Sequence, residues 1–414
     1  MANVHKNLFN NTASVLFATF SLWTGGKRMP TNGSIEPLRD YLVPKIHELV
    51  IIDELHPGSE SVLPKIEQYI NHSSTYISHE PAFIVRIMRP ILELTNTNAT
   101  QITFKIRDFL TVLCWSLQSK KTYDYLIGLE SINVLAGILL RRIGKVKRVV
   151  YYVSDYSPNR YPSKLFNRIY LALDRFCAMH ADYIWDVSKA MQPARIQAGL
   201  DPVKSAQVIH VPNGLLPGQI KVNSVSKIKK YSLVYMGTLG PENGPDVAIL
   251  ALKIVLKTFP QATLHIVGGT DKDSEWLKEL VEKNSVEKSV QFHGFIPDSI
   301  KMSKTIAACA IGLAPYRDIP GSIRKYADAG KIRAYCASGL AVVSSQVPPL
   351  GQEVAHLGGA IISNDDPKSF ARVIQSIFSS EQTYMKLRRN AILFAKNSTW
   401  DNTFTAAFQK MSVH

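Results

Sequence analysis

Residues 231–246 read Tyr-Ser-Leu-Val-Tyr-Met-Gly-Thr-Leu-Gly-Pro-Glu-Asn-Gly-Pro-Asp, which predicts a buried strand, a Gly-x-x-Gly turn and the start of a helix. Gly237 and Gly240 allow the backbone of such a turn to approach a ligand closely. Backbone amides at the turn and at the helix N-terminus can bind a pyrophosphate group. Glycines between a strand and a helix are also often purely structural, so this stretch alone leaves both interpretations open.

The alternation of strands and helices extends along the chain. We expect strands at 14–20, 49–52, 125–129, 148–153, 231–236, 262–267, 290–292, 310–314 and 340–344. We expect helices from Ser34, over 131–142, and from Pro245, Asp273, Asp298 and Lys331. This alternation is typical of parallel α/β sheets.

The length of 414 residues exceeds what one hydrophobic core usually spans. We therefore predict an α/β fold with two Rossmann-like domains, at residues 1–217 and 231–395. The polar, lysine-rich stretch 218–230 reads as a linker between them, and residues 396–414 as a C-terminal helix.

The charge of the chain is basic and unevenly distributed. The net charge is +15, and residues 1–230 carry 28 Lys and Arg against 17 Asp and Glu, which gives this half +11. A basic first half favours an anionic partner such as phospholipid or a lipid pyrophosphate. No recognition helix or interleaving of basic and aromatic residues stands out, so nucleic acid is not expected.

The cysteines and apolar runs indicate the compartment. Cys114, Cys177, Cys309 and Cys336 lie far apart and form no Cys-x-x-Cys pair, which argues against a zinc or redox site. Reduced thiols fit a reducing environment. Neither a signal peptide nor an apolar run of about 20 residues is apparent. We expect a cytoplasmic protein, or one peripheral at the cytoplasmic face of the membrane.

Two segments of the first half are amphipathic and basic. Residues 83–94 carry Arg86 and Arg89, and residues 102–117 carry Lys105 and Arg107. They are either ordinary surface helices or elements that dock on a membrane interface.

A second motif lies at 328–343, where Lys331 starts a helix that Gly339 ends. A lysine at this position faces the positive end of the helix dipole, which is unfavourable unless an anion is bound there. The alternative is a solvated surface lysine.

Together these motifs resemble the GT-B glycosyltransferases. The matching pieces are 237–244, 264–269, 292–295, 315–316, 331–339 and 399–400, together with Val-Pro-Asn-Gly at 211–214. The resemblance implies two Rossmann-like domains that face each other across a cleft, with a C-terminal helix that crosses back to the first domain. It also implies that the second domain binds a nucleotide sugar, UDP- or GDP-linked, without a cofactor or a bound metal.

The chain departs from the large retaining group of this family. The two glutamates of that group correspond here to Tyr326 and Ala334, and its Arg and Lys near the glycine turn to Thr238 and Asn243. The sequence is more similar to a divergent, inverting branch that includes the xanthan-type membrane-associated glucuronosyltransferase. That branch places a lysine and a tyrosine on the nucleoside diphosphate, at positions that match Lys331 and Tyr316.

The resemblance, with the motifs above, implies a set of residues that contact the donor. They are Gly237, Thr238, Gly240, Phe295, Tyr316, Ser322, Arg324, Lys331 and Tyr335.

The catalytic base is predicted in the first domain. The strand 148–153 ends directly before Asp155, and open α/β sheets place their chemistry at such strand ends. A carboxylate there can take the proton of an attacking acceptor hydroxyl. The alternative is that Asp155 caps the loop at Ser157. Glu130, at another strand end, is the second choice of base.

The acceptor is expected on the same domain. The candidate residues are Gly25, Gly26, Lys27, Glu130 and Arg160. The glycine–lysine loop suits an anionic acceptor or is a plain connection, and Arg160 binds an acceptor phosphate or pairs with Asp155.

We therefore predict an inverting glycosyltransferase that acts on a glycan or lipid-linked acceptor. The alternatives are a non-catalytic binding protein that retains the fold and a sugar-nucleotide epimerase.

Overall fold

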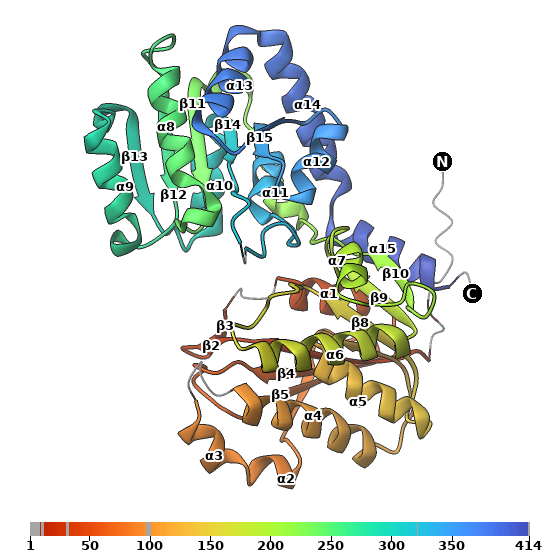
Figure 1. The fold of residues 1–414 in the computed structure, drawn as a ribbon. Coiled ribbons are helices and arrows are strands. Elements are labelled where there is room, and N and C mark those ends of the chain that lie inside the picture. Colours follow the sequence, from red (N-terminus) through yellow and green to blue (C-terminus); the bar gives the residue numbers. More distant parts are fainter. Residues whose placement is uncertain (1–8, 10–11, 30–32, 97–100, 321, 413–414) are drawn as a thin grey trace, which may run out of the picture. The chain divides into compact units, whose positions relative to one another are not determined.

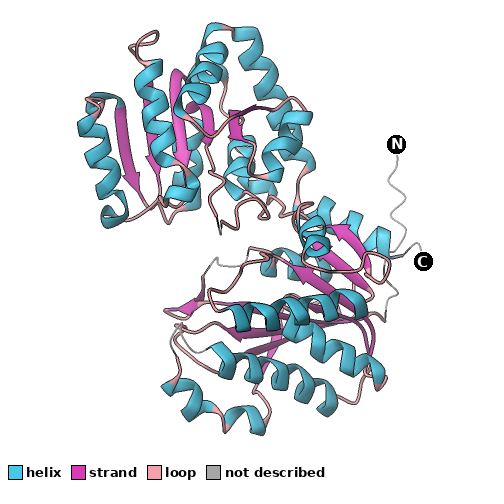
Figure 2. Ribbon diagram, in the orientation of Figure 1, coloured by secondary structure: helices cyan, strands magenta, loops and turns pink. Residues whose placement is uncertain are grey.

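The computed structural model describes residues 9, 12–29, 33–96, 101–320 and 322–412. The chain forms two compact units, which we call unit 1 (residues 1–212 and 403–414) and unit 2 (residues 213–402). Figure 2 shows that both consist of helices packed on a sheet.

The sheet of unit 1 is mostly parallel and runs in the order β10-β9-β8-β7-β1-β4-β5-β6. Its strands are β1 (Ser14–Ser21), β4 (Glu48–Leu55), β5 (Lys65–Ile70), β6 (Tyr76–His79), β7 (Tyr123–Gly128), β8 (Val146–Val153), β9 (Tyr183–Asp186) and β10 (Gln207–His210). Strands β5 and β6 pair antiparallel, which the sequence pattern did not indicate. A separate hairpin joins β2 (Trp23–Thr24) to β3 (Lys27–Arg28).

Helices cover both faces of this sheet (Figure 1). They are α1 (Ile35–Leu42), α2 (Phe83–Arg86), α3 (Arg89–Leu94), α4 (Gln101–Gln118), α5 (Ser131–Arg142), α6 (Lys164–His180), α7 (Met191–Gln197) and α15 (Trp400–Met411). Side chains alternate across a strand, so neighbours on β7 show which helix lies on which face. Leu126 lies against Gly137 of α5, and Tyr125 contacts Phe408 of α15 on the opposite face.

The C-terminal helix completes the core of unit 1, as the sequence predicts. Phe408 is buried, and its ring lies 4.8 Å from that of Phe9, 5.1 Å from Trp185 and 5.9 Å from Tyr41. Aromatic rings in such tilted and stacked pairs add to the free energy of burial. Residues from the two ends of the described chain therefore share one hydrophobic cluster.

The sheet of unit 2 is parallel and runs in the order β13-β12-β11-β14-β15-β16. Its strands are β11 (Lys229–Met236), β12 (Thr263–Val267), β13 (Val290–Gly294), β14 (Cys309–Ala314), β15 (Ala341–Ser345) and β16 (Ala360–Ser363). Its helices are α8 (Pro245–Val255), α9 (Asp271–Lys283), α10 (Ser299–Ala307), α11 (Gly330–Ala337), α12 (Pro349–His356), α13 (Pro367–Ser379) and α14 (Glu381–Asn397), with short 3-10 helices η1 (Pro217–Gln219), η2 (Val225–Lys227), η3 (Pro241–Asn243) and η4 (Glu287–Ser289). Leu233 and Tyr235 belong to one apolar cluster and Val234 to another, so β11 is buried on both sides.

Two predicted segments differ from the structure. The stretch 218–230 is not a free linker, because Lys221 N–H donates to Ala337 O at 3.0 Å and Arg388 binds the carbonyl of Asn223. The chain passes between the units at 212–213 instead. The segment 83–94 is two helices, and Pro90 at the start of the second explains the break.

We expect the core around α15 to contribute strongly to stability. Phe408→Ala should lower the free energy of unfolding of unit 1 by about 3–5 kcal/mol, because it leaves a cavity among aromatic rings. Urea unfolding followed by circular dichroism would measure this. Phe166→Ala, at a residue that is 47% exposed, is the control and should change stability little. Equal stabilities of the two variants would contradict this role of α15.

Candidate functional site

The topology of unit 2 locates a binding site at one end of its sheet. Strand β11 lies between β12 and β14, and the chain order reverses at β11, since β12 and β13 lie on one side and β14 to β16 on the other. Open α/β sheets bind ligands at the carboxyl ends of the strands at this point of reversal. The Gly237 turn follows β11, and Pro315–Tyr316 follow β14.

The glycines of the turn are required by close backbone packing. Gly237 has a φ of +127°, and its N–H donates to Val267 O at 2.9 Å. Gly244, before α8, has a φ of +67°, and a Cβ there would lie 1.8 Å from Pro315 O. The strand-to-helix connection therefore lies directly against the end of β14, with no room for a side chain between them.

Polar side chains fix the turn from inside unit 2. Tyr235 Oη donates to Thr238 O at 2.6 Å, and Asn243 Nδ2 donates to Thr238 Oγ1 at 2.9 Å. Tyr335 Oη accepts from Met236 N–H at 2.8 Å and donates to Leu313 O at 3.0 Å. Tyr335 is fully buried, and its hydroxyl joins the ends of two strands. The sequence predicts that Tyr335 contacts the nucleotide sugar, but these two backbone groups already occupy its hydroxyl.

Lys331 is the most unusual residue of this site. The residue is 6% exposed, and its Nζ has no hydrogen-bond partner among the described residues. The ammonium lies 4.1 Å from the ring centroid of Tyr235 and 4.4 Å from that of Tyr316, an arrangement in which the faces of aromatic rings attract a cation. A Cβ placed on Gly237 would lie 3.4 Å from Lys331 Cε, so the lysine reaches the glycine turn. It is not a solvated surface lysine.

The electrostatics of the site favour an anion. Burial lowers the pKa of Lys331 well below its usual value, the charge of Arg324 lowers it further, and Glu242 opposes both. Arg324 Nη2 lies 3.9 Å from Glu242 Oε1, while its Nε is buried without a partner among the described residues. Two cationic side chains thus share one carboxylate. An anion between them would restore the charge of Lys331 and supply the missing hydrogen-bond acceptors.

The structure brings most of the predicted donor residues together. Tyr316 and Gly237 contact Lys331 as described, and Ser322 Oγ accepts from the N–H of Arg324 at 3.2 Å. Phe295 is 71% exposed after β13, and no described contact links it to this group.

The sequence reading missed Glu242 and Tyr235, although both lie in the stretch 231–246. An acidic residue next to a glycine turn was a usable signal for Glu242. Nothing in the sequence alone indicates that the ring of Tyr235 faces Lys331.

Residues 271–273 read Asp-Lys-Asp, a pattern that can bind a metal, but here they begin α9. Asp273 Oδ2 accepts from Thr270 N–H and Thr270 Oγ1, each at 2.8 Å, as part of a helix cap. Asp271 is fully exposed, and its carboxylate lies 3.4 Å from Lys278 Nζ. These two carboxylates therefore lie in the first turn of α9, where that of Asp273 caps the helix.

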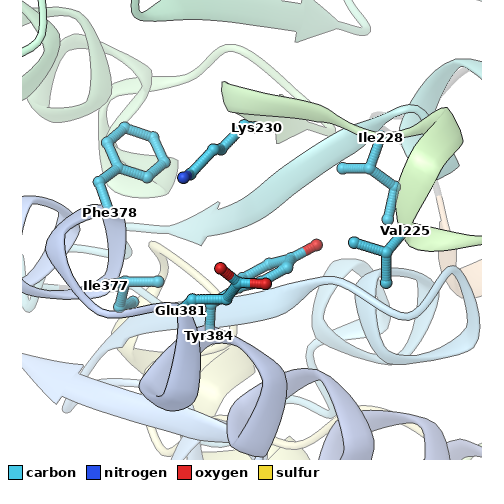
Figure 3. A pocket seen from close by; sticks show the side chains of 7 residues that line it. All are labelled: Val225, Ile228, Lys230, Ile377, Phe378, Glu381 and Tyr384. Atoms are coloured by element: carbon cyan, nitrogen blue, oxygen red, sulfur yellow. The ribbon is translucent and has the colours of Figure 1, made fainter.

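Another hollow of unit 2 lies at the opposite end of β11. A cavity of about 180 Å³ is lined by Val225, Ile228, Lys230, Ile377, Phe378, Glu381 and Tyr384 (Figure 3). Lys230 is near the start of β11, whereas the glycine turn follows its end. This cavity is therefore separate from the Lys331 site.

In unit 1 the predicted base lies beside an arginine. Asp155 follows β8 with 41% of its side chain exposed, and its Oδ2 lies 3.2 Å from Arg160 Nη1. Burial alone would lower the pKa of Arg160, but the charges of Glu130 and Asp155 raise it. Arg160 is therefore a permanent cation between two carboxylates, and its pairing with Asp155 is the alternative that the sequence left open.

Glu130 lies at the point of reversal of the unit 1 sheet, where β7 and β4 flank β1. It forms an ion pair with Lys105 of α4. Burial would raise the pKa of Glu130, but Lys105 and then Arg160 lower it, so the carboxylate is ionised. Its negative charge is already shared by two cations.

The predicted acceptor loop at Gly25–Gly26 is a tight hairpin turn. Both glycines have positive φ, +60° and +71°, as the two-residue turn of this kind requires. Gly26 N–H donates to Glu60 Oε2 at 2.8 Å, so this amide is already bound to a carboxylate of unit 1. Lys27 is exposed. This geometry fits the plain connection, one of the two alternatives that the sequence left open, and a role of the loop in acceptor binding stays a prediction.

The fold and part of the sequence match known proteins. Residues 230–380 match the family of glycosyl transferases group 1. A D-inositol 3-phosphate glycosyltransferase of Corynebacterium efficiens is 25% identical over 179 residues, which is 42% of this chain. The match spans only 40% of that relative's length.

Solved structures cover nearly the whole chain. The protein HepE of Anabaena, solved in complex with UDP, is 18% identical with a TM-score of 0.66 over 97% of this chain and 100% of that one. HepE has also been solved with UDP-glucose, with a TM-score of 0.61. A sucrose-phosphate synthase from Thermosynechococcus elongatus is 14% identical with a TM-score of 0.67 over 97% and 98% of the two chains. At these identities the likeness establishes the fold, and this fold is GT-B.

The pH dependence of stability tests the burial of Lys331. Its pKa is lowered in the folded state, so the unfolded chain binds more protons below the ordinary lysine pKa, and stability rises as pH approaches that value. Lys331→Met should therefore stabilise the ligand-free protein at neutral pH, by at most about 1.4 kcal/mol for each unit between the working pH and the ordinary lysine pKa. This gain should shrink as pH rises toward about 10.

Thermal unfolding of both proteins across this pH range would measure the effect. Lys325→Met is the matched control, because Lys325 lies on the same loop with 43% of its side chain exposed. A constant difference between Lys331→Met and wild type across the pH range would contradict the assignment.

Proposed function

We propose that the protein is a glycosyltransferase that moves a sugar from a nucleoside diphosphate sugar to an acceptor hydroxyl. The observation that carries this proposal is the buried, unpaired ammonium of Lys331 beside the glycine turn at the reversal point of unit 2. The match of residues 230–380 to glycosyl transferases group 1 supports it, as does the likeness to a protein that was solved with UDP and UDP-glucose.

The donor binds to unit 2 through its diphosphate. Lys331 and Arg324 neutralise the phosphate charge, and the N-terminus of α8 adds the positive end of its helix dipole. The N–H of Gly237 takes no part, because it is bonded to Val267 O. As the bond between the anomeric carbon and the diphosphate breaks, charge develops on the leaving group, and the same cations stabilise it. With two cations in place, transfer proceeds without a bound metal. The donor carries UDP or GDP.

The transfer inverts the anomeric carbon, with Asp155 as the base. The acceptor hydroxyl attacks the anomeric carbon, its proton passes to Asp155, and the nucleoside diphosphate leaves. Asp155 suits this role better than Glu130 because its side chain is 41% exposed, whereas that of Glu130 is 24% exposed and paired with Lys105. Arg160 Nη1 lies 3.2 Å from Asp155 Oδ2 and holds the carboxylate in position.

The absence of the two glutamates of the retaining group, at Tyr326 and Ala334, supports the inverting mechanism. The placement of Lys331 and Tyr316 is consistent with the xanthan-type branch. The acceptor is a glycan or a lipid-linked sugar.

Nucleotide-sugar binding can be tested directly. A nucleotide sugar at about 100 times its dissociation constant should stabilise the native protein by about 2.7 kcal/mol, and so raise its melting temperature. We expect the rise with a UDP- or GDP-linked sugar. It should be lost in Lys331→Met and kept in Lys325→Met. If no nucleotide sugar or nucleoside diphosphate stabilises the wild type, the proposal fails.

The role of Asp155 needs a transfer assay. Asp155→Asn should reduce the rate of transfer by about 10²–10⁴-fold, because general base catalysis contributes that much, while donor binding is retained. Asp201→Asn, at an exposed carboxylate of unit 1, is the control. Full activity of Asp155→Asn would rule out this base, and loss of activity in Glu130→Gln alone would transfer the role to Glu130.

The same assay separates two other functions. Binding of a nucleotide sugar without any turnover would indicate a non-catalytic protein. Release of the free nucleoside diphosphate without a glycoside product would indicate an epimerase.

A further inference from the structure

One helical layer of unit 1 carries an extended apolar and basic surface. Helices α4, α5 and α6 pack side by side, and α2 and α3 contact α4 (Figure 1). This layer covers the sheet face opposite to α15, as the side chains of Leu126 and Tyr125 indicate. The outer sides of these helices therefore point away from the sheet. We call this side the α2–α6 face.

The first part of the α2–α6 face lies on α2 and α3. Phe83 is 70% exposed and Leu94 is 85% exposed, and Ile87 and Ile91 between them are also exposed. The inner residues Val85 and Leu92 are fully buried. These short helices thus pack against unit 1 with one set of apolar side chains and expose a second set to solvent. Ordinary surface helices place polar residues at such outward positions.

The second part lies on α6. Leu165 is 65% exposed and Ile169 is 55% exposed, one turn apart on the same side of the helix. Phe166 beside them is 47% exposed. Clusters of exposed apolar side chains on the outer sides of one helical layer are typical of an interaction site.

The charge of the α2–α6 face has one sign. The helices contain three carboxylates, and each is already neutralised: Glu93 pairs with Arg89, Asp108 with Arg107, and Asp174 with Arg195. The exposed basic residues on these helices are Arg86, Arg142, Lys164 and Arg168, together with the paired Arg89. A partner must therefore be apolar in its interior and negatively charged at its surface.

An anionic lipid bilayer has this combination of properties. Amphipathic helices with exposed apolar side chains and flanking Lys and Arg lie in the plane of the membrane interface. A second copy of the chain fits poorly, because a two-fold contact would bring the same positive face against itself. No helix of the described residues is long and apolar enough to cross a membrane, so the contact would be peripheral.

We propose that the α2–α6 face binds the surface of an anionic phospholipid bilayer. Phe83, Leu94, Leu165 and Ile169 insert among the acyl chains near the headgroups, and Lys164, Arg168 and Arg86 contact the lipid phosphates. The proposal goes beyond the glycosyltransferase function and does not depend on it.

The chain offers a closely matched pair of variants for a test. Lys164→Glu/Leu165→Ser changes adjacent residues of the face. Val203→Ser/Lys204→Glu makes the same kind of change at an exposed apolar–basic pair elsewhere in unit 1, where Val203 is 90% exposed. A glutamate at position 164 lies in the first turn of α6, where negative charge is favourable, so folding should be retained. Phe83→Ser/Leu94→Ser tests the other end of the face.

The experiment is co-sedimentation of the full-length protein with vesicles. We expect binding to phosphatidylcholine vesicles that contain phosphatidylglycerol, weaker binding to phosphatidylcholine alone, and release by high salt. Each face variant should lower the partition coefficient by about tenfold or more, since each basic residue near an anionic surface and each inserted side chain contributes to affinity. The Val203→Ser/Lys204→Glu control should bind as the wild type does.

Three results would overturn the proposal. They are no binding to anionic vesicles, equal loss in the control variant, and concentration-dependent dimerisation that is abolished by the face variants, which would assign the face to a second copy. The thermal shift with nucleotide sugars, measured on the same variants, should be unchanged. It separates failure of this proposal from failure of the glycosyltransferase function.

Discussion

The buried ammonium of Lys331 is the constraint on which the candidate site depends. A cation that is removed from water without a counter-charge is costly, and proteins retain one only where the surroundings compensate. Here the compensation is partial. The rings of Tyr235 and Tyr316 face the ammonium, and Glu242 interacts more closely with Arg324 than with Lys331. The ammonium of Lys331 therefore still lacks a nearby negative charge and hydrogen-bond acceptors at the end of β11.

The rest of unit 2 is arranged to keep this position fixed. Tyr335 joins the ends of β11 and β14, and the positive φ of Gly244 allows the start of α8 to lie against Pro315. A side chain at Gly244 would clash with Pro315 O and separate the start of α8 from the end of β14. These contacts hold the strand ends in place, so the side chain of Lys331 stays buried even when no ligand is bound.

Much of this frame could be predicted from the sequence, because strong local patterns determine it. The apolar run before Gly237 and the glycines after it specify β11 and its turn, and the apolar period of 131–142 matches the bounds of α5. Polar or weakly apolar segments were not predictable in this way. Strand β6, at the edge of the sheet, and its neighbour β5 were not predicted because both carry mixed polar and apolar side chains. Residues 218–230 resembled a linker, although Arg388 of α14 binds this stretch.

Side-chain direction set the limit for individual residues. The sequence places Lys331 at a helix start but cannot show that its side chain points inward, and it cannot show that the hydroxyl of Tyr335 is occupied by backbone groups. In unit 1 the same limit applies to Asp155 and Glu130. Both follow strands, and only the structure shows that Glu130 pairs with Lys105, whereas the more exposed Asp155 pairs with Arg160.

The position of α15 in unit 1 has a consequence for the order in which the protein is assembled. The residues of unit 2 are synthesised after β10 and before Phe404 and Phe408, which fill the apolar space between α1, β7 and β9. On the ribosome, unit 2 can complete its core first, while the hydrophobic core of unit 1 still lacks the two phenylalanines of α15. Unit 1 is therefore the part of the nascent chain with the longest exposure to chaperones and to aggregation.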